Sequence, residues 1–128
     1  MELNIKQSPT ENKVPFESQV SILKALTHPA RIAILYILRD GEHCVCHLSA
    51  YLGFRQAYIS QQLSVLREAG LIQDRRDGWN IYYHVVNPLI FDVLDAVQLL
   101  TDEQTPSLPA PQSDCSCPHC SSKVGVVG

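Results

Sequence analysis

The sequence lacks the long apolar run that a membrane-spanning helix needs. No stretch of the chain approaches roughly 18–20 consecutive apolar side chains. Its first residues, Met1 to Lys13, are polar and hold no apolar core like that of a secretory signal. We therefore expect a cytoplasmic protein with no membrane partner, whose cysteines are reduced thiols rather than disulfides.

The residue patterns of catalysis are missing as well. We find no catalytic base, no glycine-rich phosphate loop and no pair of acids that would suggest an enzyme. With 128 residues, the chain is long enough for one hydrophobic core and too short for two comfortable ones. A binding protein is therefore expected rather than an enzyme.

An excess of positive charge is also absent, because the formal net charge is −3. This argues mildly against a nucleic-acid partner, but the charges are unevenly distributed. From Asn87 onward there are five acids against one lysine, whereas residues 51–86 hold four arginines against three acids. The middle of the chain can therefore still meet phosphates.

Apolar residues at helical spacing are present along most of the chain. They predict helices over Phe16–Leu26, Pro29 to about Arg39, Cys44–Leu52, Gln56–Ala69, and from Asn87-Pro88 to about Leu100. Two strands, 71–76 and 80–86, are expected after the fourth helix, with Asp77-Gly78 as a turn at which both residues tolerate positive φ.

A short helix, a turn at Gly53 and a longer helix form the helix-turn-helix pattern, and the hairpin that follows is a wing. In the longer helix, Ile59, Leu63 and Leu66 make a narrow apolar face. The candidate DNA contacts lie on its other face and on the wing: Arg55, Gln56, Tyr58, Ser60, Gln61, Ser64, Arg67, Arg75, Arg76 and Trp79. We predict a mainly α fold with a small β-hairpin wing, a winged helix-turn-helix, bound to double-stranded operator DNA.

The chain divides into three sections. We expect a flexible N-terminal arm over 1–15, a DNA-binding and dimerisation domain over 16–101, and a flexible cysteine-containing tail over 102–128. The last helix has more apolar residues than one small domain can bury. A second copy of the chain is the simplest partner to cover them, so we expect a homodimer.

All five cysteines lie in two places. Cys44 and Cys46 stand at the start of the helix-turn-helix, and Cys115, Cys117 and Cys120 lie in the tail. Thiolates select soft ions such as arsenite, antimonite, cadmium, lead or copper(I), with zinc also possible. Two cysteines two positions apart on a regular helix point about 200° apart, so binding both should bend or unwind the helix start.

Other readings of the thiols stay open. His43 and His47 flank the pair and could ligate a borderline metal, although we expect them at the solvated surface. His119 lies within the tail cluster and is a weaker ligand candidate. The switch could instead be redox, with Cys44 and a tail cysteine oxidised to a disulfide or persulfide bridge. A thiol-based metal carrier is the least favoured alternative.

Several segments together resemble a known family. They are Leu26-Thr27-His28-Pro29-Ala30-Arg31, Cys44-Val45-Cys46-His47-Leu48, the run Ser60 to Leu71, and the wing residues Arg76-Asp77-Gly78 with Tyr82-Tyr83. From about Leu26 to Val86 the chain resembles the ArsR/SmtB family of dimeric winged-helix metal-sensing repressors. The resemblance implies a homodimer joined through its first and last helices, which leaves its operator when an inducer binds.

The positions at which the chain departs from that family reduce the number of ions expected to act as its inducer. Ser49 stands where arsenic sensors with all their ligands in this helix have a third cysteine. The last helix has Asp92 and Asp95 but no histidine, so the family's zinc site is not expected there, and the arm has no cysteine. We therefore expect the tail to complete a site for arsenite or antimonite, with cadmium, lead or zinc as alternatives. The candidate ligands are Cys44, Cys46, Cys115, Cys117 and Cys120.

Overall fold

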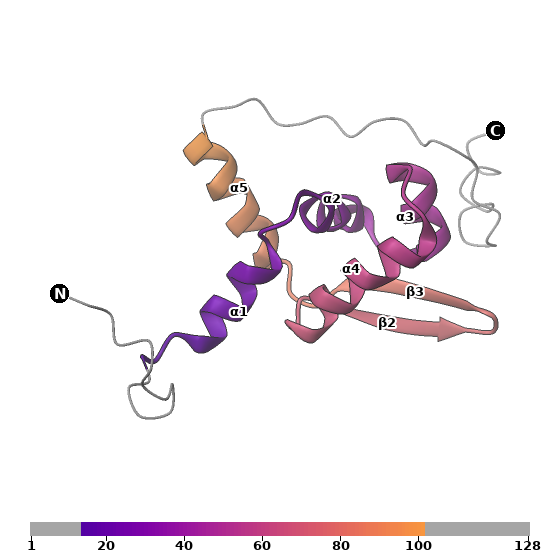
Figure 1. Ribbon diagram of the computed structural model, residues 1–128, viewed down its shortest axis with the longest axis horizontal. Helices are drawn as coiled ribbons and strands as arrows, with labels where there is room; N and C mark the ends of the chain where they lie inside the picture. Colours follow the sequence, from indigo (N-terminus) through magenta and orange to yellow (C-terminus); the bar gives the residue numbers. More distant parts are fainter. Residues whose placement is uncertain (1–13, 102–128) are drawn as a thin grey trace.

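The computed structural model describes residues 14–101 of the chain. Figure 1 shows a cluster of helices with a long two-stranded hairpin extending from it. The elements in chain order are α1 (Glu17–Ala25), α2 (Pro29–Ile37), η1 (Leu38–Asp40), β1 (His43–Cys44), α3 (Val45–Leu52), α4 (Gln56–Glu68), β2 (Ile72–Asp77), β3 (Asn80–Val85) and α5 (Leu89–Thr101). The mainly α winged helix-turn-helix predicted from the sequence is confirmed.

The helix-turn-helix is α3 and α4, packed on α2 around one core. Its largest fully buried side chains are Ile34, Leu35, Leu48, Ile59, Leu63, Leu66 and Ile72. The three residues predicted as the apolar face of α4 are all among them. Gly53 ends α3 with a φ of +76° and donates its N–H to Ser49 O. Glycine adopts this left-handed conformation without steric cost, and so the chain can turn tightly into α4.

The wing is an antiparallel hairpin within a three-stranded sheet of order β1-β3-β2. Asp77 pairs with Asn80, which makes Gly78 and Trp79 the two turn residues rather than Asp77 and Gly78. The predicted turn was therefore wrong by one position, and Gly78 takes the positive φ of +63°. The strands β2 and β3 end one residue from their predicted limits.

The strand β1 was not predicted. His43 and Cys44 pair with Tyr83 and Tyr82 of β3, so Cys44 belongs to the sheet and not to the helix that follows. A two-residue strand has no sequence periodicity of its own, and only its pairing with β3 defines it. The prediction that α3 begins at Cys44 was therefore wrong by one residue, and the difference changes the geometry of the thiols.

The first and last helices reach away from the helix-turn-helix, as Figure 1 shows. Within α1, Ala25 is the buried residue, while Phe16, Val20 and Leu23 are exposed along the same segment. The helix α5 buries Ile90, Phe91 and Leu94 against the core. It leaves a second apolar stripe exposed, formed by Leu89, Val93, Val97 and Leu100.

Between residues 14 and 101, no single helix has both the length and the apolar character needed to span a membrane. The segments Glu17–Ala25 and Pro29–Asp40 pass that test only when taken together, and they are bent by 86° at the break between them.

Candidate DNA-binding surface and thiol site

The recognition helix α4 exposes most of the polar residues predicted to meet DNA. Gln56, Ser60, Gln61 and Arg67 are exposed and Ser64 is half-buried. Arg55 is the exposed residue that precedes the helix, and its side chain makes no capping hydrogen bond. Arg55 thus stands at the N-terminal, positive end of α4, where an anion such as a phosphate is favoured.

Tyr58 is half-buried, and two other rings hold its side chain in place. Its ring lies 4.9 Å from that of Phe54, and its hydroxyl lies 3.2 Å from His28 Nε2. His28 caps α2, and its Nδ1 accepts the N–H of Ala30 at 3.1 Å. In the neutral ring the proton must therefore be on Nε2, which donates to Tyr58 Oη. The cap of α2 thus orients a side chain of the recognition helix.

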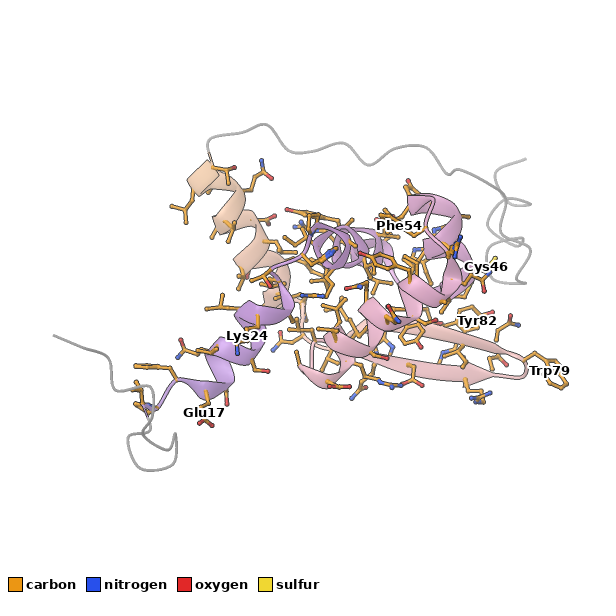
Figure 2. The ribbon with its side chains drawn as sticks, in the orientation of Figure 1. Glu17, Lys24, Cys46, Phe54, Trp79 and Tyr82 are labelled. Atoms are coloured by element: carbon orange, nitrogen blue, oxygen red, sulfur yellow. The ribbon has the colours of Figure 1, made fainter. Side chains whose placement is uncertain are left out.

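The wing carries the remaining candidate contacts, in three different environments. Trp79 is completely exposed at the tip of the hairpin, where Figure 2 labels it. Arg76 is exposed on β2. Arg75 is bound within the molecule, because its Nε donates to Glu42 Oε2 at 3.1 Å and its Nη2 donates to Glu42 Oε1. These hydrogen bonds with Glu42 raise the pKa of the Arg75 guanidinium.

The side of the wing that faces α4 is held by a second ion pair. Arg67 Nη1 lies 3.5 Å from Asp74 Oδ1, and both groups lie near Tyr83. Burial raises the pKa of Tyr83, the carboxylate of Asp74 raises it further, and Arg67 opposes them. The phenol therefore stays protonated at neutral pH and belongs to the packed part of the wing.

Cys44 is the N-cap of α3. Its backbone is extended, with φ −88° and ψ 168°, and its Sγ accepts the N–H of His47 at 3.4 Å. The side chain is only 4% exposed. Because Cys44 lies outside the helix, the predicted divergence of two thiols on a regular helix does not apply. Cys46 is partly exposed and packs in the same small cluster as Cys44 and Tyr82. The two cysteines therefore lie close together on one side of the structure.

Tyr82 joins the cysteines to the wing. It is 3% exposed, and Figure 2 labels it close to Cys46, in the half of the hairpin nearer the tip. The guanidinium carbon of Arg75 lies 5.0 Å from the centre of its ring, within the range of a cation–π contact. The ring is therefore enclosed by thiols of β1 and α3 and by a charged side chain of β2.

His43 does not lie at the solvated surface as predicted, whereas His47 is partly exposed. His43 is 3% exposed, and its ring stacks on that of His47 with centroids 4.0 Å apart and planes 9° apart. The His47 ring also contacts Tyr51, with centroids 5.5 Å apart. The prediction was wrong because β1 places His43 on the face of the sheet that packs against the helices. That burial depends on the unpredicted strand.

Among residues 14–101, no three histidine, cysteine or acidic side chains are close enough to hold a metal ion. Cys115, Cys117, His119 and Cys120 lie outside the described residues. On α5, both carboxylate oxygens of Asp95 accept hydrogen bonds from Arg39, each at 3.1 Å. Asp95 is thus part of an ion pair with Arg39.

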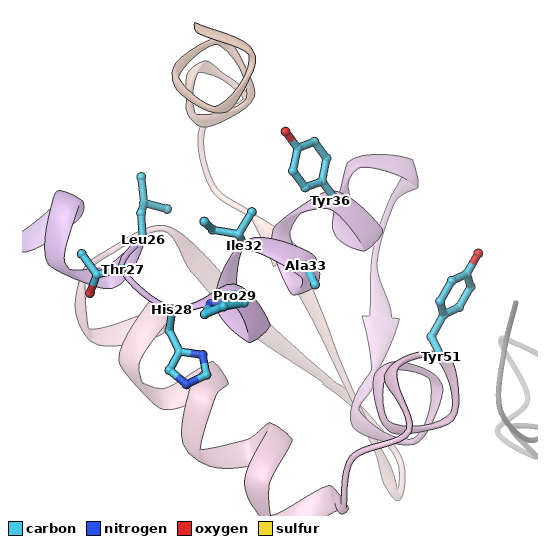
Figure 3. A pocket seen from close by; sticks show the side chains of 8 residues that line it. All are labelled: Leu26, Thr27, His28, Pro29, Ile32, Ala33, Tyr36 and Tyr51. Carbon is cyan, nitrogen blue, oxygen red and sulfur yellow. The ribbon is translucent and has the colours of Figure 1, made fainter. Parts of the chain in front are cut away.

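A separate apolar groove of about 670 Å³ lies on the outer face of α2. Figure 3 shows Leu26, Thr27 and His28 at one end, Pro29, Ile32 and Ala33 along its floor, and Tyr36 and Tyr51 at the other end. Neither Cys44 nor Cys46 lines it. The thiol site and this groove are therefore distinct features of the surface.

Comparison with known proteins identifies the family to which this fold belongs. Residues 28–74 match the family described as "Bacterial regulatory protein, arsR family". The chain belongs to the ArsR family. It is 41% identical over 76 residues to the biofilm growth-associated repressor of Agrobacterium fabrum, a match that covers 59% of this chain and 65% of that repressor. It is 39% identical over 85 residues to the arsenic resistance transcriptional regulator ArsR1 of Pseudomonas putida, which covers 60% and 66% of the two chains.

The chain therefore spans just under two thirds of the length of each of these two relatives. Among solved structures it resembles the homodimeric winged helix-turn-helix DNA-binding domain Mb0332 of Mycobacterium bovis. The TM-score is 0.63 at 25% identity, over 79% of this chain and 92% of that one. The members of this family are DNA-binding transcriptional regulators rather than enzymes.

Sequence reasoning missed three residues that shape these surfaces. It did not find that Glu42 binds Arg75, that Cys44 caps α3, or that His28 holds Tyr58. Ser, Thr, Asp and Asn are the residues by which an N-cap is recognised, so a cysteine cap gave no signal. The other two contacts join residues 33 and 30 positions apart, which only the fold brings together.

Proposed function

We propose that this chain is a homodimeric repressor that leaves its operator when a thiophilic ion binds its cysteines. Arsenite or antimonite is the favoured inducer, and cadmium, lead or zinc is the alternative. Residues 16–101 are the DNA-binding and dimerisation unit, and the segment 102–128 contributes ligands to the ion. The observation that carries this proposal is the pairing of Cys44 and Cys46 at the first element of the helix-turn-helix.

The DNA-binding half of the proposal rests on α4 and the wing. In a helix-turn-helix the second helix enters the major groove, and its exposed polar side chains reach base edges and phosphates. The contacts that we propose are Arg55, Gln56, Tyr58, Ser60, Gln61, Ser64, Arg67, Arg75, Arg76 and Trp79. Tyr58 has a geometric support besides its position, because His28 and Phe54 orient it before DNA arrives.

The thiol half rests on the chemistry of the donors. Sulfur ligands select soft ions, and a helix N-terminus favours the thiolate that binds them. Cys44 already accepts a backbone N–H of α3, so an ion that takes this sulfur disturbs the start of the DNA-reading unit. The arsenic-resistance regulator of P. putida, 39% identical in sequence, agrees with arsenite as the first ion to test.

The two sulfurs are too few for a complete site. A three-sulfur site suits arsenite or antimonite, and four sulfurs suit cadmium or zinc, so we propose Cys115, Cys117 and Cys120 as the source of the others. Thirteen residues lie between Thr101, where α5 ends, and Cys115. Fully extended, such a stretch spans roughly 45 Å, enough to reach α3 of the same chain or of a second copy.

The decisive experiment measures operator affinity by fluorescence anisotropy on the reduced protein at fixed salt. We expect arsenite to release the operator at about one equivalent per subunit if three sulfurs of each chain hold one ion. Parallel titrations with cadmium, lead and zinc identify a four-sulfur site if one of those ions is the more effective. Salt must be constant because phosphate contacts make affinity strongly salt-dependent.

The variants Cys44→Ser and Cys46→Ser test the ligands directly. Serine is a good N-cap, so Cys44→Ser should fold, keep α3 capped and bind operator while ignoring arsenite. The triple variant with serine at 115, 117 and 120 asks whether the tail supplies the remaining sulfur. Full arsenite-driven release from the Cys44→Ser/Cys46→Ser double variant would refute the proposed ligands.

A redox switch is the second candidate, favoured by the hydrogen bond from His47 N–H to Cys44 Sγ. A thiolate held at a helix start reacts with oxidants more readily than an ordinary thiol. This candidate predicts operator release by peroxide or polysulfide and recovery with dithiothreitol. If operator affinity stays constant in the peroxide titration and in the polysulfide titration, the redox switch is excluded. The ion-binding proposal is not affected by that result.

A further inference from the structure

A closed chain of contacts links the cysteine pair to the wing. Cys44 pairs with Tyr82 in the sheet, and the two side chains are 4% and 3% exposed. Tyr82 pairs with Arg75 on its other side, and the Arg75 guanidinium carbon lies 5.0 Å from the centre of the Tyr82 ring. Arg75 in turn binds Glu42, two residues before Cys44. The contacts thus return to the residue that immediately precedes β1, the strand where they began.

This arrangement leaves Cys44 little freedom to move alone. Buried side chains are packed at the density of organic crystals, so a change in the size or direction of one is taken up by its neighbours. Cys46 and Tyr82 form an apolar cluster with Cys44. Displacing the Tyr82 ring disturbs the cation–π contact with Arg75, and with it the ion pair that fastens β2 to the start of β1.

The same contacts determine where the wing points. The hairpin extends from the sheet, and Trp79 at its tip lies three residues from Tyr82 on β3 and four from Arg75 on β2. Arg75 is nearly half exposed, yet its forked hydrogen bonds are made to Glu42. A guanidinium used in this way joins β2 to the residue that precedes β1, across β3, which lies between the two strands.

We propose that Tyr82, Arg75 and Glu42 transmit ligand binding at Cys44 to the orientation of the wing. Arg75 is then a positioning residue for the switch in addition to any contact it makes with DNA. This inference rests on the proposed function, because it names how the thiol site of that function acts on DNA. It predicts that breaking the link leaves arsenite binding intact while arsenite no longer weakens operator binding.

The test compares Arg75→Gln with a matched control. Arg39 makes the same two kinds of contact elsewhere, a forked pair with Asp95 and a ring contact with Phe91 at 5.1 Å, so Arg39→Gln is the control. For each protein, the operator dissociation constant is measured with and without sodium arsenite, and the ratio of the two is the coupling factor. The ratio cancels a phosphate contact of Arg75 that is equally strong with and without arsenite. Tyr82→Phe keeps the ring and should keep the coupling.

Coupling between two sites commonly amounts to about 5- to 150-fold, and we expect the wild-type ratio in that range. In Arg75→Gln it should fall by about fivefold or more, and in Arg39→Gln it should stay at the wild-type value. The arsenite stoichiometry, measured by calorimetry, should be the same in all four proteins. That result separates loss of transmission from loss of the site.

A second readout does not involve DNA. Trp79 is the one tryptophan in the sequence, so the protein labelled with 5-fluorotryptophan gives a fluorine NMR signal from the wing tip alone. Arsenite should shift this signal in the wild type and in Arg39→Gln but not in Arg75→Gln. Equal coupling factors and equal shifts in the wild type and Arg75→Gln would overturn the link and leave the proposed function standing. A wild type whose operator affinity responds to none of arsenite, cadmium, lead and zinc would overturn both.

Discussion

At the scale of single residues, several side chains stabilise the arrangement of the helices because each makes hydrogen bonds to more than one element. Arg31 is the clearest case. Its Nε donates to Ala25 O at 2.7 Å and its Nη2 to Lys24 O at 3.3 Å, which caps the last carbonyls of α1. Its Nη1 donates to Gln62 Oε1 at 2.7 Å on α4. One guanidinium therefore joins α1, α2 and the recognition helix.

We expect Arg31→Ala to lower the free energy of unfolding by about 1–3 kcal/mol, because Gln62 is 8% exposed and loses the donor to its amide oxygen. Urea denaturation measures this change. The double variant Arg31→Ala/Gln62→Leu should recover part of it, since replacing both polar partners removes the unsatisfied group. Arg76→Ala, exposed on β2, should stay within about 0.5 kcal/mol of the wild type. Equal destabilisation by both arginine variants would contradict this account.

At the scale of elements, α5 is held to the core by its buried face and by one ion pair. Arg39 of η1 binds Asp95 through both carboxylate oxygens and lies over the Phe91 ring. The hydrogen bonds from Arg39 lower the pKa of Asp95 below its ordinary value. Both side chains are about half exposed, so water screens the pair and its effect on stability is small.

The sign of the pH dependence follows from that lowered pKa. A carboxylate with a lower pKa in the folded than in the unfolded chain stabilises the fold above the unfolded value, about 3.9, and this contribution is lost as pH falls through the folded value. We expect Asp95→Asn to melt below the wild type at pH 6, and the difference to shrink below about pH 4. Melting curves by circular dichroism at a series of pH values measure it. A difference that grows toward acid pH would show that the pair is not its cause.

At the scale of the whole molecule, the exposed apolar faces are the main feature that one chain leaves unexplained. Phe16, Val20 and Leu23 near α1 and the stripe Leu89, Val93, Val97 and Leu100 on α5 lie on the two helices that extend from the core. The Mb0332 domain, which shares the fold, is described as homodimeric. We propose that these two faces meet those of a second copy.

Val97→Glu tests this interface, because Val97 is 45% exposed in one chain and would become buried between two. An unpaired buried charge costs about 3–5 kcal/mol, so we expect the dimer dissociation constant to rise by about 100-fold or more. Sedimentation equilibrium measures it. Val65→Glu, at a similarly exposed valine on α4, is the control and should stay dimeric. If both variants are dimers, α5 does not form the interface.

Apart from β1 and η1, the order and type of the elements could be predicted from the sequence, and so could the exposed polar face of α4. Helical periodicity, Pro29 at the start of α2 and Gly53 after α3 are local signals, and each depends on residues within a few positions. The candidate contacts on α4 followed from the same periodicity. The thiol site was predicted only as a pair of residues. Its geometry was wrong because Cys44 is placed by pairing with Tyr82, 38 positions along the chain.

The sequence by itself determined that the chain is a winged helix-turn-helix with soft donors beside its DNA-reading unit, because local propensity and spacing are enough to specify these. The tertiary structure alone decided the cap at Cys44, the burial of His43 and the contacts of Arg75 with Tyr82 and Glu42. Each of these depends on strands β1, β2 and β3 lying side by side. Hydrogen bonds and packing between distant segments have no periodic signature, so only the folded chain shows how the cysteines are connected to the wing.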